Sequence, residues 1–553
     1  MTDIAQLHPV SESQKITENN ARLAASESVI ECINPATGEW LGNVAALSPE
    51  GVNAVVAKAR SAQARWAKST FRQRRAVLTH IMTHILEHAD ELCDLIVKDS
   101  GKTYENAMMG EVLPICTKIK WLLKNGEKHL KPEAVGSGMF LHKKARIEYV
   151  PLGVVACIIP WNYPLQNIIS SLVAPLMAGN SVVLKASEAV AWSSQRFQKI
   201  TDEALSREGF SPDTVQIING YGATGAALVR SGVNKILFIG SVENGRRIIQ
   251  GSAEHLTPVV MELGGKDPFI VCEDADLDKA VHSALGGTFI NLGQNCIASE
   301  RIIVLDGVYD AFVQKLLAHA RPLRQGVPKR GGAVDVGAVA TQQQMKIIDS
   351  LVQDAIDKGA KVLLGGKKST QDSLANGNFY PPTILADVTS DMAIASNEVF
   401  GPVMLLMRVG SDKEAIDLAN STEFGLQSSI LTKNRERGER IASQLETGAS
   451  CINDFGLCYL NQDLPFGGVK YSGYGRMNGR DGLRAYTNHK AVLVDRFPIE
   501  IPPKLYPVGP HDYDAAKRMI QMLYAPTFRS KFAAFGQLVL VTLRKLLPNR
   551  NAS

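Results

Sequence analysis

The sequence predicts a doubly wound α/β fold, in which helices cover both faces of a mainly parallel sheet. Between residues 154 and 253, short apolar runs alternate with segments of helical periodicity. The apolar runs are continuous, which is typical of strands that are buried on both faces. A second region of the same kind begins at Met261, and a chain of 553 residues is long enough for two domains. Dinucleotides usually bind to sheets of this type.

The segments before the first α/β region predict a strand, several helices and a ribbon. Residues 32–38 are typical of a strand that ends in a Pro/Gly turn. Ser48 and Pro49 suit the start of a helix, and further helices are expected over about 72–88 and 92–100. Residues 135–150 combine turn residues with short alternating segments, which predicts a protruding β ribbon.

Periodicity then gives the elements of the two α/β regions. In the first region the strands and helices are expected at Val154–Pro160, Leu165–Ala178, Ser181–Lys185, Ser193–Glu208, Thr214–Ile218, Gly225–Ser231, Lys235–Ile239 and Gly245–Ala253. In the second region a buried strand at 268–272 precedes a helix that the acidic residues at 274–278 cap. Later strands are expected at 301–305, 361–364 and 403–408.

After Val494 the alternation stops, and prolines 498, 502, 503 and 507 predict a stiff linker. A basic amphipathic tail follows, which Pro526 should divide into two short helices. Its most apolar stretch, residues 532–543, is too short to cross a hydrocarbon core of about 30 Å. Because basic and apolar residues occur together, we expect the tail either to contact a membrane surface or to pack on protein.

Charge and composition exclude several classes of protein. With 45% hydrophobic and 21% charged residues the chain is neither disordered nor fibrous. The net charge is +5, but the segment from Lys504 onward contains eight basic residues and only two acidic ones. The rest of the chain is therefore slightly acidic, and no nucleic-acid-binding face is expected.

The cysteines and the N-terminus indicate a reducing, cytoplasmic setting. Eight cysteines are dispersed without a C-x-x-C motif or a His pair at metal spacing, so no metal site is expected. Residues 1–31 are polar, lack the apolar core of a secretory signal and are expected to be flexible.

One thiol and one carboxylate suggest covalent chemistry. Cys296 lies in a Gly-Gln-Asn-Cys context, and Glu262 precedes Gly264, Gly265 and Lys266. A nucleophilic thiol and a carboxylate that activates water are the minimum for forming and hydrolysing a thioester. Two alternatives remain: Cys296 is ordinary core packing, or Glu262 is a structural partner of Lys266.

A glycine motif also points to a dinucleotide. Gly220, Gly222 and Gly225 form a G-x-G-x-x-G pattern that follows a strand and opens a helix. Glu243 lies near the distance expected of a ribose-binding acid. Taken alone, the motif predicts the loop that holds the pyrophosphate.

Seven further motifs occur along the two α/β regions. They are Pro160-Trp161-Asn162-Tyr163-Pro164, Lys185-Ala186-Ser187-Glu188, Phe238-Ile239-Gly240-Ser241, Glu262-Leu263-Gly264-Gly265-Lys266, Gly293-Gln294-Asn295-Cys296, Asn397-Glu398-Val399-Phe400-Gly401-Pro402 and the glycine-rich segment 465–473. In this order they resemble the aldehyde dehydrogenase superfamily over roughly residues 32–495. The segments 453–455, 495–497 and 506–508 resemble a plant and fungal subgroup with an extra C-terminal extension.

The resemblance implies an aldehyde dehydrogenase-like fold: a doubly wound dinucleotide-binding domain, a second α/β catalytic domain and a small β oligomerisation ribbon. The expected division is a flexible N-terminus (1–31), the dinucleotide-binding domain (32–134 and 156–267), the catalytic domain (268–472), the ribbon (135–155 and 473–495) and the basic tail (496–553). A homodimer or homotetramer is expected.

The resemblance also implies a catalytic set of three residues. Cys296 attacks the aldehyde, and the Asn162 amide with the Cys296 backbone N–H stabilises the resulting oxyanion. Hydride then passes to NAD and leaves a thioester, for whose hydrolysis Glu262 deprotonates water.

The expected cofactor-binding residues extend from the nicotinamide to the adenosine. Glu398 is expected to hold the nicotinamide ribose, with Phe400 beside the ring. Lys185 and Glu188 reach the adenosine ribose, where a carboxylate repels a 2′-phosphate and favours NAD over NADP. By resemblance the phosphates lie at the helix after Ser241, not at the G-x-G-x-x-G turn. The full set is Ile159, Pro160, Trp161, Lys185, Ser187, Glu188, Gly222, Gly225, Gly240, Ser241, Leu263, Glu398 and Phe400.

Three other functions remain open at this stage. An NADP-using semialdehyde dehydrogenase would need an arginine for its charged substrate, and none is evident around Tyr163, Asn295, Ile297 or Phe455. A CoA-acylating enzyme usually lacks a base like Glu262. A catalytically silent dinucleotide-binding scaffold would have lost one of the catalytic residues, all of which are present.

Overall fold

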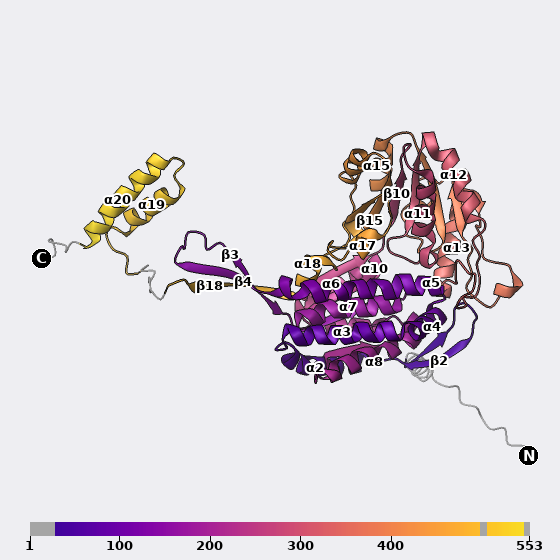
Figure 1. Cartoon of the computed structure of the whole chain (residues 1–553), viewed down its shortest axis with the longest axis horizontal. Coiled ribbons are helices and arrows are strands. Elements are labelled where there is room, and N and C mark those ends of the chain that lie inside the picture. Colours follow the sequence, from indigo (N-terminus) through magenta and orange to yellow (C-terminus); the bar gives the residue numbers. More distant parts are fainter. Residues whose placement is uncertain (1–27, 498–505, 547–553) are drawn as a thin grey trace, which may run out of the picture. The chain divides into compact units, whose positions relative to one another are not determined.

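The computed structural model describes residues 28–497 and 506–546 (Figure 1). The expectations for residues 1–27, for the prolines at 498, 502 and 503, and for the last seven residues fall outside this range. The chain divides into two compact units. Among the described residues, one comprises 28–133 together with 146–492, and the other comprises 134–145 together with 493–497 and 506–546.

The first unit contains a six-stranded sheet with the strand order β17-β9-β8-β5-β6-β7. Its strands are β5 (Val154–Ile158), β6 (Ser181–Lys185), β7 (Val215–Ile218), β8 (Lys235–Gly240), β9 (Val259–Leu263) and β17 (Gly473–Tyr474). Strands β5 to β9 are parallel, and β17 pairs antiparallel with β9. The chain winds outward from β5 to β7 and returns to β8 beside β5. This reversal leaves a crevice at the carboxyl ends of β5 and β8, where ligands bind in such folds.

Helices cover both faces of this sheet, as the continuous apolar runs predict. Val154, Ala156 and Ile158 of β5 pack with residues of α2 (Pro49–Trp66), α9 (Gly222–Arg230) and α10 (Val242–Ser252). The alternate residues Val155 and Cys157 belong to the core on the opposite side. That side is formed by α3 (Phe71–Glu87), α4 (Ala89–Ser100), α6 (Leu113–Leu130), α7 (Pro164–Ala178) and α8 (Ala191–Arg207), several of which lie side by side in Figure 1.

Local signals account for the ends of several helices. Ser48 caps α2 by accepting the Gly51 N–H at 3.3 Å, as predicted. Thr70 and Gln73 form a capping box at the start of α3. Helix α6 had no sequence-based prediction. It follows α5 (Tyr104–Ala107) and a π-helical turn at Met108–Val112, an irregularity that periodicity does not reveal.

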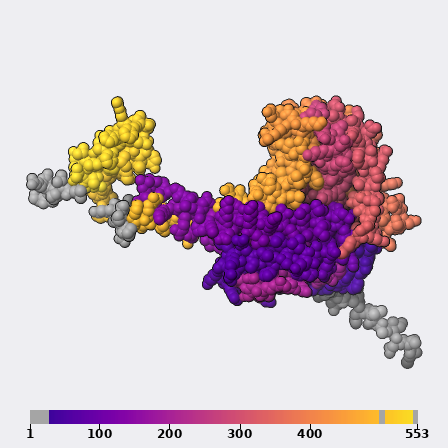
Figure 2. All heavy atoms as spheres, viewed as in Figure 1, coloured from indigo at the N-terminus to yellow at the C-terminus, as the bar shows by residue number. Residues whose placement is uncertain are grey.

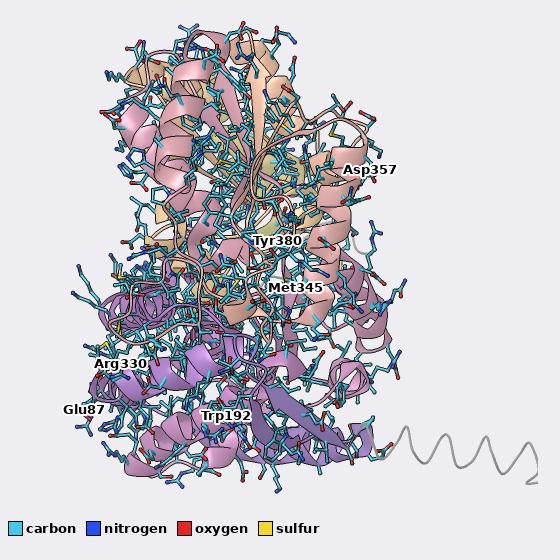
Figure 3. The ribbon with its side chains drawn as sticks, turned by 90° about the vertical axis from the view of Figure 1, so that its right-hand side faces the viewer. Glu87, Trp192, Arg330, Met345, Asp357 and Tyr380 are labelled. Carbon is cyan, nitrogen blue, oxygen red and sulfur yellow. The ribbon has the colours of Figure 1, made fainter. Side chains whose placement is uncertain are left out.

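A seven-stranded sheet forms the second lobe of the first unit, with the order β12-β13-β14-β11-β10-β15-β16. Its strands are β10 (Asp267–Val271), β11 (Ser299–Leu305), β12 (Lys361–Leu364), β13 (Thr383–Ala386), β14 (Val403–Val409), β15 (Gln427–Leu431) and β16 (Ala449–Ile452). All are parallel except β12. The covering helices are α11 (Leu277–Phe289), α12 (Asp306–Ala320), α13 (Gln342–Asp357), α15 (Asp412–Asn420) and α16 (Arg435–Ala442). Figure 3 shows Tyr380 and Met345 in this lobe and Trp192 in the other.

The remaining strands form two small sheets. β1 (Val29–Ile33) and β2 (Trp40–Ala45) pair antiparallel. The ribbon is a three-stranded sheet of order β18-β4-β3, made of β3 (Glu133–Val135), β4 (Lys143–Pro151) and β18 (Thr487–Asp495). Within the segment 473–495, only β18 belongs to this sheet, because β17 pairs with β9 and α18 (Gly479–Arg484) packs on α6 and α7.

The tail forms the two helices that Pro526 predicts, α19 (Asp512–Tyr524) and α20 (Phe528–Leu546), which pack on each other (Figures 1 and 2). Lys545 of α20 forms an ion pair with Asp512 of α19. Over the described ranges, no helix is both long and apolar enough to cross a membrane.

Candidate active site

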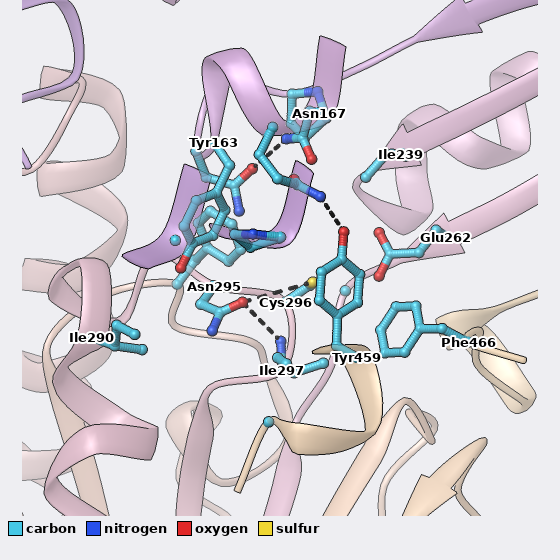
Figure 4. Close-up of a pocket in the computed structure, with 18 of the residues that line it drawn as sticks. Tyr163, Asn167, Ile239, Glu262, Ile290, Asn295, Cys296, Ile297, Tyr459 and Phe466 are labelled. Atoms are coloured by element: carbon cyan, nitrogen blue, oxygen red, sulfur yellow. Dashed lines mark hydrogen bonds between the residues drawn. The ribbon is translucent and has the colours of Figure 1, made fainter. Parts of the chain in front are cut away.

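A cavity of about 530 Å³ in the first unit brings most of the predicted residues together (Figure 4). Its wall includes the carboxyl ends of β5 and β8, strand β9, the turn before β11 and the segment after α14 (Ala393–Ser396). Ten predicted residues line it: Pro160, Trp161, Asn162, Gly240, Ser241, Glu262, Leu263, Cys296, Glu398 and Phe400. The catalytic trio and the residues predicted for the nicotinamide end therefore share one cavity.

The other six predicted residues lie along the same edge of the six-stranded sheet, outside this cavity. Ile159 follows β5, Lys185 ends β6, and Ser187 and Glu188 come directly after it; Gly222 and Gly225 open α9 after β7. Because the strands are parallel, these ends line up. Lys185 Nζ lies 3.1 Å from Glu188 Oε2; Lys185 is buried, whereas the Glu188 side chain is 44% exposed.

A strained turn presents Cys296. Asn291, Leu292 and Gly293 have φ values of 50°, 58° and 70°, so three consecutive residues occupy the left-handed region. Such conformations cost free energy in residues other than glycine and persist only when the surroundings hold them. The Asn291 amide does so by donating to the carbonyl oxygens of Asn162 (2.9 Å) and Gln294 (3.0 Å). At Gly293 a Cβ would lie 2.1 Å from the Gly401 carbonyl oxygen, so only glycine fits.

The Cys296 thiol faces the cavity, where a hydrogen bond joins it to Glu262. Its Sγ lies 3.9 Å from Asn295 Oδ1. Burial, and then the nearby charge of Glu262, raise the pKa of the thiol well above its ordinary value. Cys296 is therefore a neutral thiol here, and its reaction needs a base in the same cavity.

Glu262 on β9 has the properties of that base. Its side chain is buried, and within the part of the chain that the structure describes its Oε1 has no hydrogen-bond partner. Burial raises the pKa of Glu262 to about 7, opposed by a hydrogen bond with Cys296. Figure 4 shows its carboxyl, the Cys296 sulfur and the Tyr459 ring together in the cavity. A carboxyl with a pKa near neutrality can both accept and release a proton at physiological pH.

The alternative that Glu262 pairs with Lys266 is wrong. The Lys266 ammonium forms a fully buried ion pair with Glu300 at the start of β11. Glu300 also accepts the backbone N–H groups of Val399 (3.0 Å) and Phe400 (3.2 Å). The pair therefore supports the segment that carries Glu398, and among the described residues no cation is paired with Glu262.

Glu398 is held close to the backbone after β9. Its Oε1 accepts the Gly265 N–H at 3.0 Å, and a Cβ on Gly264 would lie 2.2 Å from its other carboxyl oxygen. Burial raises the pKa of Glu398 to about 8. Phe400, with φ 51°, places its ring edge-on to Trp161 at 5.4 Å between centroids.

Asn162 is oriented by a buried network that the sequence analysis missed. Its Nδ2 donates to the Gln294 carbonyl (3.1 Å), and its Oδ1 accepts from Asn167 (3.2 Å). Lys102 donates to the Asn162 carbonyl and to Glu111, both at 2.7 Å. The amide keeps a second N–H for a substrate oxygen. No spacing rule connects residues 102 and 111 to the site, and Glu111 lies in the π-helical turn, which has no sequence signal.

The rest of the wall was also unpredicted and is mainly apolar. It includes Met109, Leu113, Pro114, Gln166, Asn167, Ile290, Gln344, Ile347, Asp454, Leu457, Tyr459, Leu460, Phe466 and Met477. Tyr459 accepts a hydrogen bond from Gln166 and packs edge-on against Phe466 at 4.8 Å. Among the described residues that line the cavity, none is a lysine or an arginine.

The crevice could hold a dinucleotide, and the N-terminus of α10 is the part of it that is suited to phosphates. Ser241 caps this helix by accepting the Asn244 N–H at 3.4 Å, so the positive helix end faces the crevice between β5 and β8. At Gly222 and Gly225 of the G-x-G-x-x-G turn, an added Cβ would meet no described atom within 4 Å. In a dinucleotide-binding motif close packing requires these glycines, and such packing is missing at these two positions. Glu243, the acid expected at the ribose in that reading, is exposed and forms an ion pair with Arg247.

Comparisons with known proteins agree with this geometry. Residues 23–492 match the Aldehyde dehydrogenase family. An aldehyde dehydrogenase-like protein of Schizosaccharomyces pombe is 38% identical over 487 residues, 87% of this chain and 93% of the relative. A succinate-semialdehyde dehydrogenase (NADP(+)) of Mycolicibacterium paratuberculosis is 36% identical, over 84% of this chain and 96% of the relative. The NAD+ complex of a Bacillus cereus aldehyde dehydrogenase aligns with a TM-score of 0.79 and 32% identity, covering 86% and 94% of the two chains.

The superfamily resemblance and the α/β fold class are thereby confirmed, while the finer resemblance to a plant and fungal subgroup stays a prediction. The match covers both sheets and every residue predicted for the site. The chain therefore belongs to the aldehyde dehydrogenase family and is an oxidoreductase that acts on aldehydes.

Proposed function

We propose that this chain oxidises an apolar aldehyde to the carboxylic acid with NAD, through a thioester on Cys296. The observation that carries the proposal is the Cys296 thiol and the cation-free Glu262 carboxyl in one cavity beside the Glu398 segment. A silent scaffold is not favoured, because Asn162, Glu262, Cys296 and Glu398 are all present there.

Each residue has a distinct task in this mechanism. Glu262 takes the thiol proton, and Cys296 Sγ adds to the aldehyde carbon. The second N–H of the Asn162 amide and the Cys296 backbone N–H stabilise the oxyanion, and such donors are typically worth about 10²–10³ in rate. The bound dinucleotide supplies the hydride acceptor. Glu262 then deprotonates the water that hydrolyses the thioester, while the absence of a cation keeps its pKa near neutrality.

The domain assignment follows the two sheets. The dinucleotide-binding domain (32–134 and 156–267) corresponds to the six-stranded sheet with its helices, and the catalytic domain (268–472) to the seven-stranded sheet. The turn that carries Cys296 precedes β11 of the second sheet, whereas Glu262 belongs to β9 of the first. The reaction therefore takes place between residues of both domains.

NAD is favoured over NADP by the position of Glu188. Its half-exposed carboxylate, beside the buried Lys185, follows β6 at the edge where the adenosine ribose is expected. A negative charge there repels a 2′-phosphate and accepts a hydrogen bond from a 2′-hydroxyl. The two relatives named for their cofactors differ, one with NAD+ and the other with NADP(+).

An uncharged, apolar substrate fits the cavity best. Leu457, Tyr459 and Phe466 line its aldehyde side, and Met109, with 58% of its surface exposed, extends the apolar lining outward. Since the described lining contains no cationic side chain, a substrate carboxylate would be buried without a partner. An NADP-using semialdehyde dehydrogenase is therefore the less favoured alternative, as is a CoA-acylating enzyme, because the Glu262 base is present.

We also expect a homodimer or homotetramer. β18 is an edge strand of the ribbon and is exposed along most of its length, and edge strands are commonly covered by a partner. The eight free cysteines fit a reducing, cytoplasmic compartment.

We propose that the two tail helices, α19 and α20, bind anionic membrane surfaces without crossing them. Phe528 and Phe532 of α20 are 83% and 67% exposed. Lys517, Arg518, Arg529 and Lys531 are basic residues on the same two helices. Apolar burial with attraction of about 1 kcal/mol per basic residue near the surface is sufficient for peripheral binding.

The pH dependence of turnover tests the role of Glu262. Because the base must be ionised and its pKa is raised to about 7, the rate of NADH formation should fall as the pH drops through neutrality and level off above it. Glu262→Gln should lose about 10²–10⁴ in rate and this pH dependence. A Glu262→Gln variant with the unaltered pH profile would assign the titration to another group.

Cofactor titrations test the assignment of Glu188. Glu188→Ala should weaken NAD binding by about tenfold or more, the effect of losing a charge-assisted hydrogen bond, and should narrow the preference over NADP. Glu243→Ala, which removes an exposed carboxylate beside the G-x-G-x-x-G turn, is the matched control and should change little. The reverse result would restore the glycine motif as the cofactor loop.

Flotation with anionic vesicles at low salt tests the tail. The full-length protein should float with the vesicles and a chain ending at Pro498 should not, and raised salt should weaken binding because the attraction is partly electrostatic. Full-length Phe528→Ser/Phe532→Ser, which keeps all basic residues, should bind more weakly. Equal, complete absence of binding by the full and shortened chains would show that the tail packs on protein.

A further inference from the structure

Two thiols outside the catalytic centre lie in contact with each other. Cys451 is buried on the edge strand β16, and Cys458 is half-buried on the one-turn helix α17 (Leu457–Leu460). Their Sγ atoms are 3.1 Å apart, and the Cys458 thiol also lies 3.4 Å from the Ser450 carbonyl oxygen. A disulfide bond measures about 2.05 Å, so a movement of about 1 Å would bring the sulfurs to bonding distance.

The helix that carries Cys458 is also part of the cavity wall. Leu457, Tyr459 and Leu460 of α17 line the cavity, on either side of Cys458 in the sequence. The residue before α17 is Gly456, with φ 72°, a conformation that glycine adopts freely. A single helical turn after such a residue can shift by about 1 Å without disturbing a long element.

We propose that Cys451 and Cys458 are a redox-active pair. Oxidation joins them in an intramolecular disulfide and thereby alters the position of α17 in the wall of the cavity that would bind the aldehyde. The site is separate from Cys296, which lies on the turn before β11. Disulfide formation does not depend on the proposed function, whereas its effect on aldehyde binding does.

The oxidant is a low-molecular-weight disulfide, such as oxidised glutathione. The Cys458 thiolate attacks one of its sulfurs, which forms a mixed disulfide and releases one thiolate. Cys451 then loses its proton and attacks Cys458 Sγ, which forms the protein disulfide and releases the second thiolate. Two protein thiols are thereby oxidised, one small disulfide is reduced to two thiols, and two protons balance the released thiolates.

The surroundings assign the attacking and the resolving thiol. The hydrogen bond from Cys451 lowers the pKa of Cys458, and the same interaction, with burial, raises the pKa of Cys451. Cys458 is also the more exposed of the two. An accessible thiol with a lowered pKa supplies more of the attacking thiolate, and the buried partner is protected from the external disulfide.

Peptide mapping tests disulfide formation directly. Trypsin releases both cysteines in one peptide, 441–470, and Cys296 in another, 280–301. After treatment of the full-length protein with oxidised glutathione and alkylation of remaining thiols, peptide 441–470 should be unalkylated and lighter by two hydrogen atoms. Dithiothreitol should restore two alkylation sites. Two alkylated cysteines, or a persistent glutathione adduct, would overturn the proposal.

The effect of the disulfide on the cavity wall is measured separately, by the KM for the aldehyde. Oxidation should change the KM for an apolar aldehyde by about threefold or more, because a displacement of about 1 Å in the cavity wall alters the fit of the substrate. The KM for NAD should stay unchanged. Under the same treatment Cys458→Ser still undergoes any loss of activity that oxidation of Cys296 causes, but it cannot form the disulfide. Its aldehyde KM should therefore stay constant. Cys116→Ser, a change at another half-buried cysteine, should behave like the unaltered chain. Disulfide formation with an unchanged aldehyde KM would overturn the link to the wall.

If the chain turns over no aldehyde at all, the proposed function fails while the mapping experiment still decides the redox pair. If it turns over aldehyde but peptide 441–470 keeps both thiols, the redox pair fails and the proposed function stands. The two proposals are thus separable in one set of samples.

Discussion

A buried ion pair between Lys266 and Glu300 is the interaction on which the site depends. Lys266 follows β9, which carries Glu262; Glu300 lies four residues after Cys296 and also holds the backbone of Val399 and Phe400. One pair therefore ties together the predicted base, the nucleophile and the nicotinamide-binding segment. Buried pairs rarely add net stability, but removing one partner typically costs about 3–5 kcal/mol because a charge is left uncompensated. We interpret its role as alignment of three segments that are distant in sequence.

The same pair influences the chemistry of Glu262, because Lys266 is engaged with Glu300 and not with Glu262. A lysine beside Glu262 would favour the carboxylate and lower its pKa, whereas burial without a cation raises the pKa to about 7. The site also contains backbone strain at Asn291–Gly293 and close approaches at Gly264 and Gly293, where any side chain would collide with Glu398 or with the Gly401 carbonyl. These features cost stability and present Cys296 and Glu398 to the cavity, as is common at functional sites.

The sequence predicted the parts that depend on local patterns. The continuous apolar run of β5 indicated burial on both faces, Ser48 and Pro526 marked helix ends, and the motif residues lie in or beside one crevice. Long-range pairing could not be predicted from the sequence. The sequence places Glu262 near Lys266, and only the fold shows that Glu300 is the partner of this lysine. The Lys102–Glu111 pair behind Asn162 depends on a π-helical turn without a sequence signal. The apolar wall around Tyr459 comes from segments whose residues, taken singly, are typical of any core.

The central claim is that Cys296 carries the acyl group and Glu262 releases it, and trapping of the covalent species tests this most directly. Glu262→Gln lacks the charge that raises the pKa of Cys296, so at alkaline pH its thiol should ionise without the base. Mixed at that pH with NAD and an apolar aldehyde, then quenched in acid and digested, this variant should yield peptide 280–301 heavier by the acyl group, with about one NADH formed for each acylated chain. Cys296→Ala should give neither product. An acyl group on another peptide, or NADH formation without any acylated cysteine, would contradict the account.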